Sequence, residues 1–324
     1  MAAAWPEPPL LVTGRLSDLP LDLLLSPWAL ALVGLAVGSF LNVVVHRLPL
    51  MLERQWWGDV AAQLVDADSY RRVFAAAAPQ GLGQTGGTLD QSLATLPPLN
   101  LARPASRCPS CGHRIRWYEN LPVASWLVLK GRCSACGTRI ALRYPLVELA
   151  TATLFALVAW RVGPQPQTLL WCGVVAALLA LALIDWDTTV LPDALTLPLL
   201  WAGLVAAALG WLPELTLAQS LGGVAAGYLS LWSVYWLFKL VTGKEGMGYG
   251  DFKLLGALGA WLGWQAILPI VLMASVLGAI VGLGMKAGGA LREGRFVPFG
   301  PFLAGGGLVV MLAGLPTVLG WMGW

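Results

Sequence analysis

The chain has 324 residues, of which 57% are hydrophobic and only 11% are charged. This composition excludes an intrinsically disordered chain and argues against an ordinary soluble enzyme. The formal net charge of +3 is small, so the basic residues give no indication of a nucleic-acid partner. We therefore predict an all-α polytopic membrane protein.

Residues 1–25 form a predicted external tail, and they lack the basic start, short apolar core and cleavage site of a secretory signal. Beyond this tail, runs of roughly 20 apolar residues predict about eight transmembrane helices. The predicted spans are 26–45, 144–160, 167–184, 194–211, 217–240, 251–262, 266–285 and 300–322. We divide the chain into a first transmembrane helix (26–46), a polar segment (47–143) and a membrane-embedded domain (144–324).

The polar segment 47–143 is predicted to be cytoplasmic, because it contains 12 of the 20 Lys and Arg residues. Basic residues are enriched in cytoplasmic loops, and the eight-span count leaves only Arg15 and Arg161 outside. Within this segment, residues 75–99 are rich in Ala, Gly, Gln and Thr and lack helical periodicity. They predict a flexible loop. We identify no internal repeat in the chain.

Four cysteines in the same segment form two CxxC pairs, Cys108/Cys111 and Cys133/Cys136, with 21 residues between the pairs. Four thiolates at this spacing suit a tetrahedral Zn²⁺ ion, and a cytoplasmic location argues against disulfides. The alternatives are four reduced cysteines or a redox pair. Adjacent to this motif, His113 can replace one ligand, although its ordinary interpretation is a solvent-facing loop residue.

The predicted zinc site lies in a compact, zinc-ribbon-like module of residues 108–143. Because four protein ligands leave no open position for water, we interpret the metal as structural. Metal binding would then fold a segment too small to hold a core of its own. The fifth cysteine, Cys172, lies in a predicted span and is interpreted as a small packing residue.

Three aspartates follow the apolar run that ends at Ile184: Asp185, Asp187 and Asp193. An ionisable side chain at membrane depth costs roughly 2.5–3.5 kcal/mol on insertion scales, which makes such residues functional candidates. The sequence allows Asp187 either to tune Asp185 or to face water. For Asp193, which follows Pro192, we favour the role of a cap on the next helix.

A second acid, Asp251, follows Gly248 and Gly250, whose backbone freedom can present it at the start of a helix. A helix cap is the simpler interpretation for an isolated motif of this kind. The eight-span count, however, places Asp251 and Asp185 on the same cytoplasmic face. Two carboxylates a few ångströms apart share a proton, so that one can act as a general base and the other as an acid.

Together these residues resemble the bacterial type IV prepilin peptidases, which are bifunctional leader peptidases and N-methyltransferases of the GxGD aspartyl protease group. The resemblance covers most of the chain. The motifs that carry it are, in chain order, Gly38-Ser39-Phe40-Leu41-Asn42-Val43, His46-Arg47-Leu48-Pro49, the two CxxC pairs, Asn120-Leu121-Pro122, Ser125-Trp126-Leu127, Gly131-Arg132-Cys133, Arg143-Tyr144-Pro145-Leu146-Val147-Glu148, Ile184-Asp185, Leu191-Pro192-Asp193 and Gly248-Tyr249-Gly250-Asp251-Phe252-Lys253.

The resemblance implies removal of a basic leader from type IV prepilins and type II secretion pseudopilins at the bacterial inner membrane. It also implies methylation of the new amino terminus with S-adenosylmethionine. The residues it indicates are catalytic Asp185 and Asp251, supporting Asp187, Gly248, Gly250 and Lys253, and Gly131 and Arg132 for methylation. No glycine-rich motif after a strand shows a cofactor site independently.

Glu53 and Glu148 are interpreted as interfacial charges. No Ser-His-Asp arrangement competes with the aspartate pair, because only His46 and His113 are present. Two alternatives remain open. One is a non-enzymatic assembly factor with a zinc docking module and aspartates as helix caps. The other is a transporter that uses the acids as a proton relay, although the paired discontinuous helices of such transporters are absent.

Overall fold

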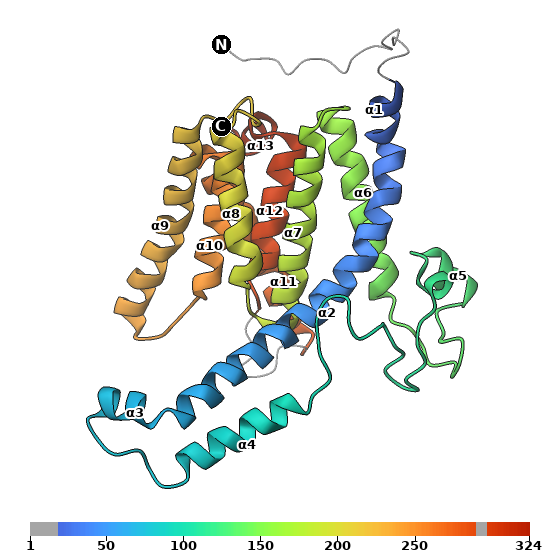
Figure 1. The fold of residues 1–324 in the computed structure, drawn as a ribbon. Coiled ribbons are helices and arrows are strands. Elements are labelled where there is room, and N and C mark those ends of the chain that lie inside the picture. The colour runs from blue at the N-terminus through green and yellow to red at the C-terminus, as the bar shows by residue number, and fades with distance from the viewer. Residues whose placement is uncertain (1–18, 290–296) are drawn as a thin grey trace.

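A computed structural model describes residues 19–289 and 297–324 of the chain (Figure 1). Most of the predicted external tail, residues 1–18, therefore lies outside the described residues, as do Arg292 and Arg295. The described part of the tail is a short helix, α1 (Leu19–Leu24). No strand occurs in these described ranges, and their regular secondary structure is helical apart from two isolated β-bridges. The all-α prediction is confirmed.

Eight helices form a bundle in which successive members run in opposite directions (Figure 1). They are α2 (Pro27–Val65), α6 (Arg143–Val162), α7 (Gln167–Thr188), α8 (Asp193–Ala208), α9 (Leu217–Thr242), α10 (Tyr249–Leu262), α11 (Ile267–Ala287) and α12 (Gly300–Ala313). Five of the described helical segments are long and apolar enough to cross a membrane, or six if one bent pair is a single span. The protein is therefore a multi-pass membrane protein, but length supports fewer full spans than eight.

Helix α10 is short because it lies inside the bundle, packed against α8, α9 and α12. Phe252 and Leu255 are completely buried there. Glycines bring α9 and α10 together, since a Cβ on Gly223 would lie only 2.1 Å from the carbonyl oxygen of Gly259. Small residues at such contacts allow helices in membranes to approach closely. The bundle thus surrounds the first turn of α10, which carries Asp251.

The predicted span over residues 300–322 is not one continuous helix but a bent pair of helices, α12 and α13. The chain breaks at Gly314, and α13 (Leu315–Trp321) turns by 109° from the axis of α12. Gly314 has φ +86°, a conformation that glycine adopts at little cost, and Pro316 at the start of α13 has no N–H to continue the preceding helix.

Outside the bundle, α2 continues well beyond the predicted end of its span. This extension pairs with α4 (Leu82–Ala94), and α3 (Ala67–Phe74) lies between them in sequence. Together they form a projection from one end of the bundle (Figure 1), which we call the arm. The predicted flexible loop over 75–99 is therefore wrong. Gly86 explains the difference, because a Cβ there would lie 2.8 Å from the Ala61 carbonyl oxygen and the two helices pack directly.

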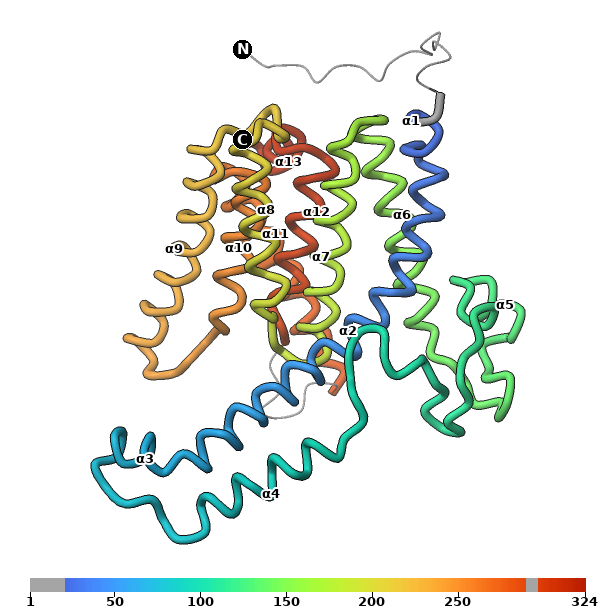
Figure 2. The backbone as a smooth tube through the Cα atoms, viewed as in Figure 1, coloured from blue at the N-terminus to red at the C-terminus, as the bar shows by residue number. Residues whose placement is uncertain are grey.

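The cysteine-bearing segment follows α4 and lies beside the lower part of α6, on the other side of α2 from the arm (Figure 2). It holds η1 (Trp117–Asn120) and α5 (Ala124–Val128), which are both short. Both this module and the arm leave the same end of the bundle, which we call the arm end.

Candidate active site and metal centre

The two acids proposed as a pair lie at the arm end of the bundle. Asp185 is in the last turn of α7, and Asp251 is in the first turn of α10. Figure 1 shows these two helix ends at the same end of the molecule. Both side chains are buried, with relative exposures of 5% and 8%. Residues that are 66 positions apart in sequence are thus brought into one region of the bundle interior.

A third helix holds Asp185 in place. The N–H of Gly300, the first residue of α12, donates to Asp185 Oδ2 at 3.0 Å. The start of a helix presents unpaired N–H groups and a partial positive charge, which suit a carboxylate. A Cβ on Gly300 would lie 2.6 Å from Oδ2, so only glycine allows this approach. Nothing in the sequence motifs indicated Gly300.

Asp251 is held differently. Its Oδ1 is buried and has no hydrogen-bond partner among the described residues, and its carboxyl interacts electrostatically with that of Asp185. Asp251 is the third residue of α10 and Gly248 is the N-cap, so Asp251 is not the N-cap residue itself, although its carboxyl group has a hydrogen bond with the Gly248 backbone. A buried carboxyl oxygen without a partner requires an explanation beyond stability.

The two glycines before Asp251 have different structural roles. A Cβ on Gly250 would lie 2.8 Å from the Leu191 Cβ, so Gly250 is required by packing. On Gly248 the nearest atom to a Cβ would be Asp251 Oδ2, at 3.8 Å. This is an ordinary van der Waals distance, so packing does not require glycine at position 248.

Two ion pairs connect the helices around the acids. The Arg143 guanidinium donates to both carboxylate oxygens of Asp187, at 2.8 and 2.7 Å, and links α6 to α7. Lys253 Nζ lies 2.7 and 2.8 Å from the Asp193 oxygens and links α10 to α8. Asp193 is the first helical residue and makes no capping bond, so the cap prediction is wrong.

The four cysteines converge as the CxxC spacing predicts. Their Sγ atoms all lie within 4.8 Å of one another, and those of Cys108 and Cys136 are 3.8 Å apart. Four thiolates around Zn²⁺ at about 2.3 Å would have S···S edges of about 3.8 Å, so the donor set fits a tetrahedral ion. His113 is not among the converging ligand atoms of this cluster. Cys172 is buried in the core, as predicted for a packing residue.

The module is an internal repeat that the sequence analysis did not identify. Residues 107–115 and 132–140 share the pattern Arg-Cys-x-x-Cys-Gly-x-Arg-Ile, and we call them the first and second knuckles. Each closes with an isolated β-bridge between its two arginines, Arg107 with Arg114 and Arg132 with Arg139. Gly112 and Gly137 occupy equivalent turns with φ +72° and +70°. The repeat is short, and its CxxC spacing predicts a metal site rather than a repeated structural unit.

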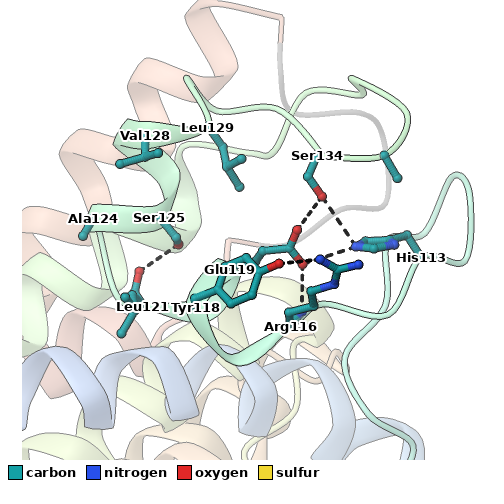
Figure 3. A pocket seen from close by; sticks show the side chains of 11 residues that line it. His113, Arg116, Tyr118, Glu119, Leu121, Ala124, Ser125, Val128, Leu129 and Ser134 are labelled. Atoms are coloured by element: carbon teal, nitrogen blue, oxygen red, sulfur yellow. Dashed lines mark hydrogen bonds and ion pairs between the residues drawn. The ribbon is translucent and has the colours of Figure 1, made fainter.

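A pocket of about 560 Å³ lies between the knuckles and α5 (Figure 3). At its base, Glu119 accepts from the Arg116 N–H at 2.8 Å and from the Ser134 hydroxyl at 2.5 Å, and it lies 3.2 Å from His113 Nε2. His113 is therefore half-buried against Glu119, contrary to its prediction as a solvent-facing residue. The hydrogen bond from Arg116 N–H, with those from Ser134 and His113, lowers the pKa of Glu119 to about 2.

Gly131 and Arg132, the residues predicted to serve methylation, do not line this pocket. Gly131 has φ +65°, and a Cβ there would lie 2.8 Å from the Trp126 ring, so the glycine is explained by local packing. Val123, the residue before α5, also has a positive φ, +58°, which is unusual for a β-branched residue.

Glu148 is buried rather than interfacial, so that interpretation is wrong. Its carboxylate accepts from the Val123 N–H at 2.7 Å and thereby ties the turn before α5 to helix α6. The sequence around Glu148 does not show that a backbone N–H from the turn before α5 holds this carboxylate. Glu53 is exposed on α2.

Comparisons with known proteins match nearly the whole chain. A model described as the bacterial Peptidase A24 N-terminal domain matches residues 32–162, and one described as the type IV leader peptidase family matches residues 172–283. Relatives of the same printed name, prepilin leader peptidase/N-methyltransferase, occur in Pseudomonas putida (50% identity over 87% of this chain and 88% of the relative), Aeromonas hydrophila (47%, over 87% and 89%) and Burkholderia pseudomallei strain 1026b (48%, over 89% and 85%). No solved structure matches the chain.

Proposed function

The chain belongs to the type IV leader peptidase family, and we propose that it removes the basic leader of type IV prepilins with Asp185 and Asp251 as its catalytic pair. The observation that carries this assignment is the buried, unpartnered Asp251 Oδ1, at the same end of the bundle as the buried Asp185. Both acids lie inside the segment that matches the peptidase family. A helix-capping role, which a non-enzymatic assembly factor would need, does not fit these positions.

The chemistry follows from two carboxyl groups that share one proton. The ionised member takes a proton from water as the water oxygen attacks the scissile carbonyl. The protonated member donates to the carbonyl oxygen, and collapse of the tetrahedral intermediate releases the new amino terminus with a proton. The N–H of Gly300 keeps Asp185 oriented while the protons move.

A helical substrate must unwind near the site, because its backbone carbonyls are otherwise hydrogen-bonded within the helix. Gly248, which carries no side chain beside Asp251 Oδ2, is proposed to let an unwound backbone approach that acid. On either side, the pairs Arg143–Asp187 and Lys253–Asp193 are proposed to position α7 and α10. In this way Asp187, Gly248, Gly250 and Lys253 support the reaction without taking part in the proton transfer.

We place the protein in the bacterial inner membrane with the arm end on the cytoplasmic side. Lys239, Lys253 and Lys286 lie at that end of α9, α10 and α11, and the module there is rich in arginine. This distribution agrees with the positive-inside rule. It supports the division into an external tail (1–25), a first span (26–46), a cytoplasmic segment (47–143) and a membrane-embedded protease domain (144–324).

Zn²⁺ is the metal proposed for the four-cysteine cluster, with a structural role. The cluster uses all four tetrahedral positions, so it offers no site for water or substrate. Cys108 and Cys111 would hold the first knuckle, and Cys133 and Cys136 the second. Because each knuckle is too small to form a core, the metal would supply much of the folding free energy of the module.

N-methylation of the new amino terminus is the second proposed activity, with pseudopilins of type II secretion as further substrates. The names of the relatives support it. S-adenosylmethionine would supply an electrophilic methyl group. The amine lone pair of the cleaved pilin would form the N–C bond as the C–S bond of the donor breaks. The electron pair of the C–S bond would stay on sulfur, and the amine proton would pass to water.

The peptidase assignment is tested with the purified chain and a prepilin in detergent. Asp185→Asn and Asp251→Asn should each abolish leader cleavage, because neither amide can share a proton in this way. Asp90→Asn is the matched control, since Asp90 is an exposed acid on α4 in the arm. Cleavage by either active-site variant at the rate of the control would overturn the assignment.

A further inference from the structure

The pocket of the cysteine module has one apolar and one polar wall (Figure 3). Helix α5 contributes Val128, and Leu129 follows it, while Leu121 extends the apolar side. Opposite them lie His113 of the first knuckle and Ser134 of the second. The pocket is therefore shaped for a ligand with a flat apolar part and several polar groups.

Glu119 gives the base of this pocket a fixed negative charge. Its side chain is 9% exposed, and the Arg116 N–H, the Ser134 hydroxyl and His113 hold its two oxygens. Each carboxylate oxygen has two acceptor sites, so capacity remains for a ligand. The Arg116 guanidinium, which donates to the Tyr118 hydroxyl, supplies a positive charge at the rim.

A second pocket, about 330 Å³ in volume, offers a useful contrast. It is lined by prolines together with Arg103, Arg107 and Arg114, and no acid lines it. A positively charged ligand would be repelled there, whereas it would be attracted to Glu119. Among these two pockets, only that of Glu119 suits a cationic ligand.

The two family matches place the acid pair and the Glu119 pocket in different segments of the chain. Asp185 and Asp251 lie in the peptidase match, residues 172–283, while the Glu119 pocket lies in the N-terminal match, residues 32–162. The four-cysteine site is closed and offers no ligand position of its own. The pocket beside the cluster, in contrast, is a concavity of the module that a ligand can enter.

We propose that the pocket between α5 and the knuckles binds the methyl donor, S-adenosylmethionine, with Glu119 as its acidic anchor. This inference rests on the proposed N-methyltransferase function. The donor carries a flat base, a sugar with hydroxyl groups, a sulfonium, an amino group and a carboxylate. The apolar wall suits the base, the Glu119 carboxylate suits hydroxyl and cationic groups, and Arg116 suits the carboxylate.

The metal would set the width of this site. His113 is two residues after Cys111, and Ser134 directly follows Cys133, so each polar wall residue is fixed by a ligand of the metal cluster. This arrangement explains how a closed, structural metal can matter for methyl transfer. It acts on the position of the polar wall rather than on the reacting atoms.

The test is isothermal titration of S-adenosylmethionine into the purified full-length chain. Val128→Trp should raise the Kd at least about tenfold by filling the pocket, and Glu119→Gln by about tenfold through loss of a charged hydrogen bond. Leu127→Trp is the matched control, because Leu127 is exposed on the same helix but does not line the pocket. Val128 is itself 80% exposed, so a larger side chain there should not disturb folding.

Ultraviolet cross-linking of the bound donor, followed by peptide mass spectrometry, gives a second readout and should label residues of the pocket. Zinc content establishes that each variant is folded. Unchanged donor affinity in both Val128→Trp and Glu119→Gln would overturn the pocket and leave the N-methyltransferase proposal standing. Absence of both donor binding and methyl transfer in the unaltered chain would overturn the underlying function as well.

Discussion

Asp251 in the bundle and Glu119 in the cysteine module are carboxylates with opposite surroundings. Asp251 Oδ1 is buried without a hydrogen-bond donor, while Glu119 is held by two donors and a histidine. A carboxyl group with an unpartnered oxygen can bind a proton there, whereas an acid whose two oxygens both accept from donors is fixed as an anion. The contrast agrees with the roles that we propose, proton transfer for Asp251 and electrostatic recognition for Glu119.

The two regions also differ in what holds them together. Helices of the bundle pack through glycines and buried apolar side chains, as at Gly223 and Gly259. In the module, short hydrogen-bonded turns depend on four converging thiols. We therefore expect that each region can lose its function while the other keeps its own, and the following predictions test this independence.

The largest effect is expected for Asp251→Asn. Leader cleavage should fall by about 100- to 10,000-fold, the usual contribution of a general acid or base. Methylation of a synthetic peptide with the mature pilin amino terminus should continue, because the module is unaltered. Mass spectrometry of both products checks this. Loss of both activities, with the zinc content intact, would show that the two regions are not independent.

Metal removal should give the opposite pattern. Stripping the cluster with a chelator should abolish methylation, because the metal fixes the polar wall of the Glu119 pocket, while leader cleavage continues. Measured zinc release should parallel the loss of methylation, and restoring Zn²⁺ should recover it. Cleavage that falls in step with zinc release would contradict the separation.

A smaller but more specific effect is expected for Gly300→Ala. The new Cβ would lie 2.6 Å from Asp185 Oδ2 and must displace it. A misplacement of about 1 Å at a catalytic group can cost about 100-fold in rate. Gly305→Ala in the same helix is the control, because no atom lies within 4 Å of its Cβ position. Equal cleavage rates in the two variants would remove Gly300 from the site.

Lys253→Met should have the smallest effect. The Lys253–Asp193 pair is part-exposed, and such pairs contribute about 0–1 kcal/mol, so cleavage should fall by less than about fivefold. Lys239→Met, which breaks the comparable pair with Glu245, should leave the cleavage rate unchanged. A loss as large as that of Asp251→Asn would give Lys253 a role in the chemistry itself.

Much of the fold and of both sites could be predicted from local pattern. Apolar runs gave most helices of the bundle, and charge at membrane depth singled out Asp185 and Asp251. The CxxC spacing gave the metal cluster, because the residues that converge are close in sequence. The acids and the paired cysteines are recognisable because each is an unusual residue type for its surroundings in the sequence.

Other features depend on contacts that leave no local pattern. Helix α4 forms where glycine content argues against a helix, because Gly86 packs closely on α2. The Gly300 N–H, which orients Asp185, is a backbone group from a distant helix. Glu119 and Glu148 look like ordinary surface acids until the folded chain brings donors to them.

The continuity of α2 has a mechanical consequence. Its membrane part packs on α6 so closely that a Cβ on Gly38 would lie 2.6 Å from the Glu148 Cα, and its other end carries the arm. A protein that pulls on the arm must either bend this rod at Pro49 or tilt it against α6. Tilting would shift Glu148 and the turn at Val123 that it holds. A force applied to the arm would therefore change the position of the cysteine module through helix α2.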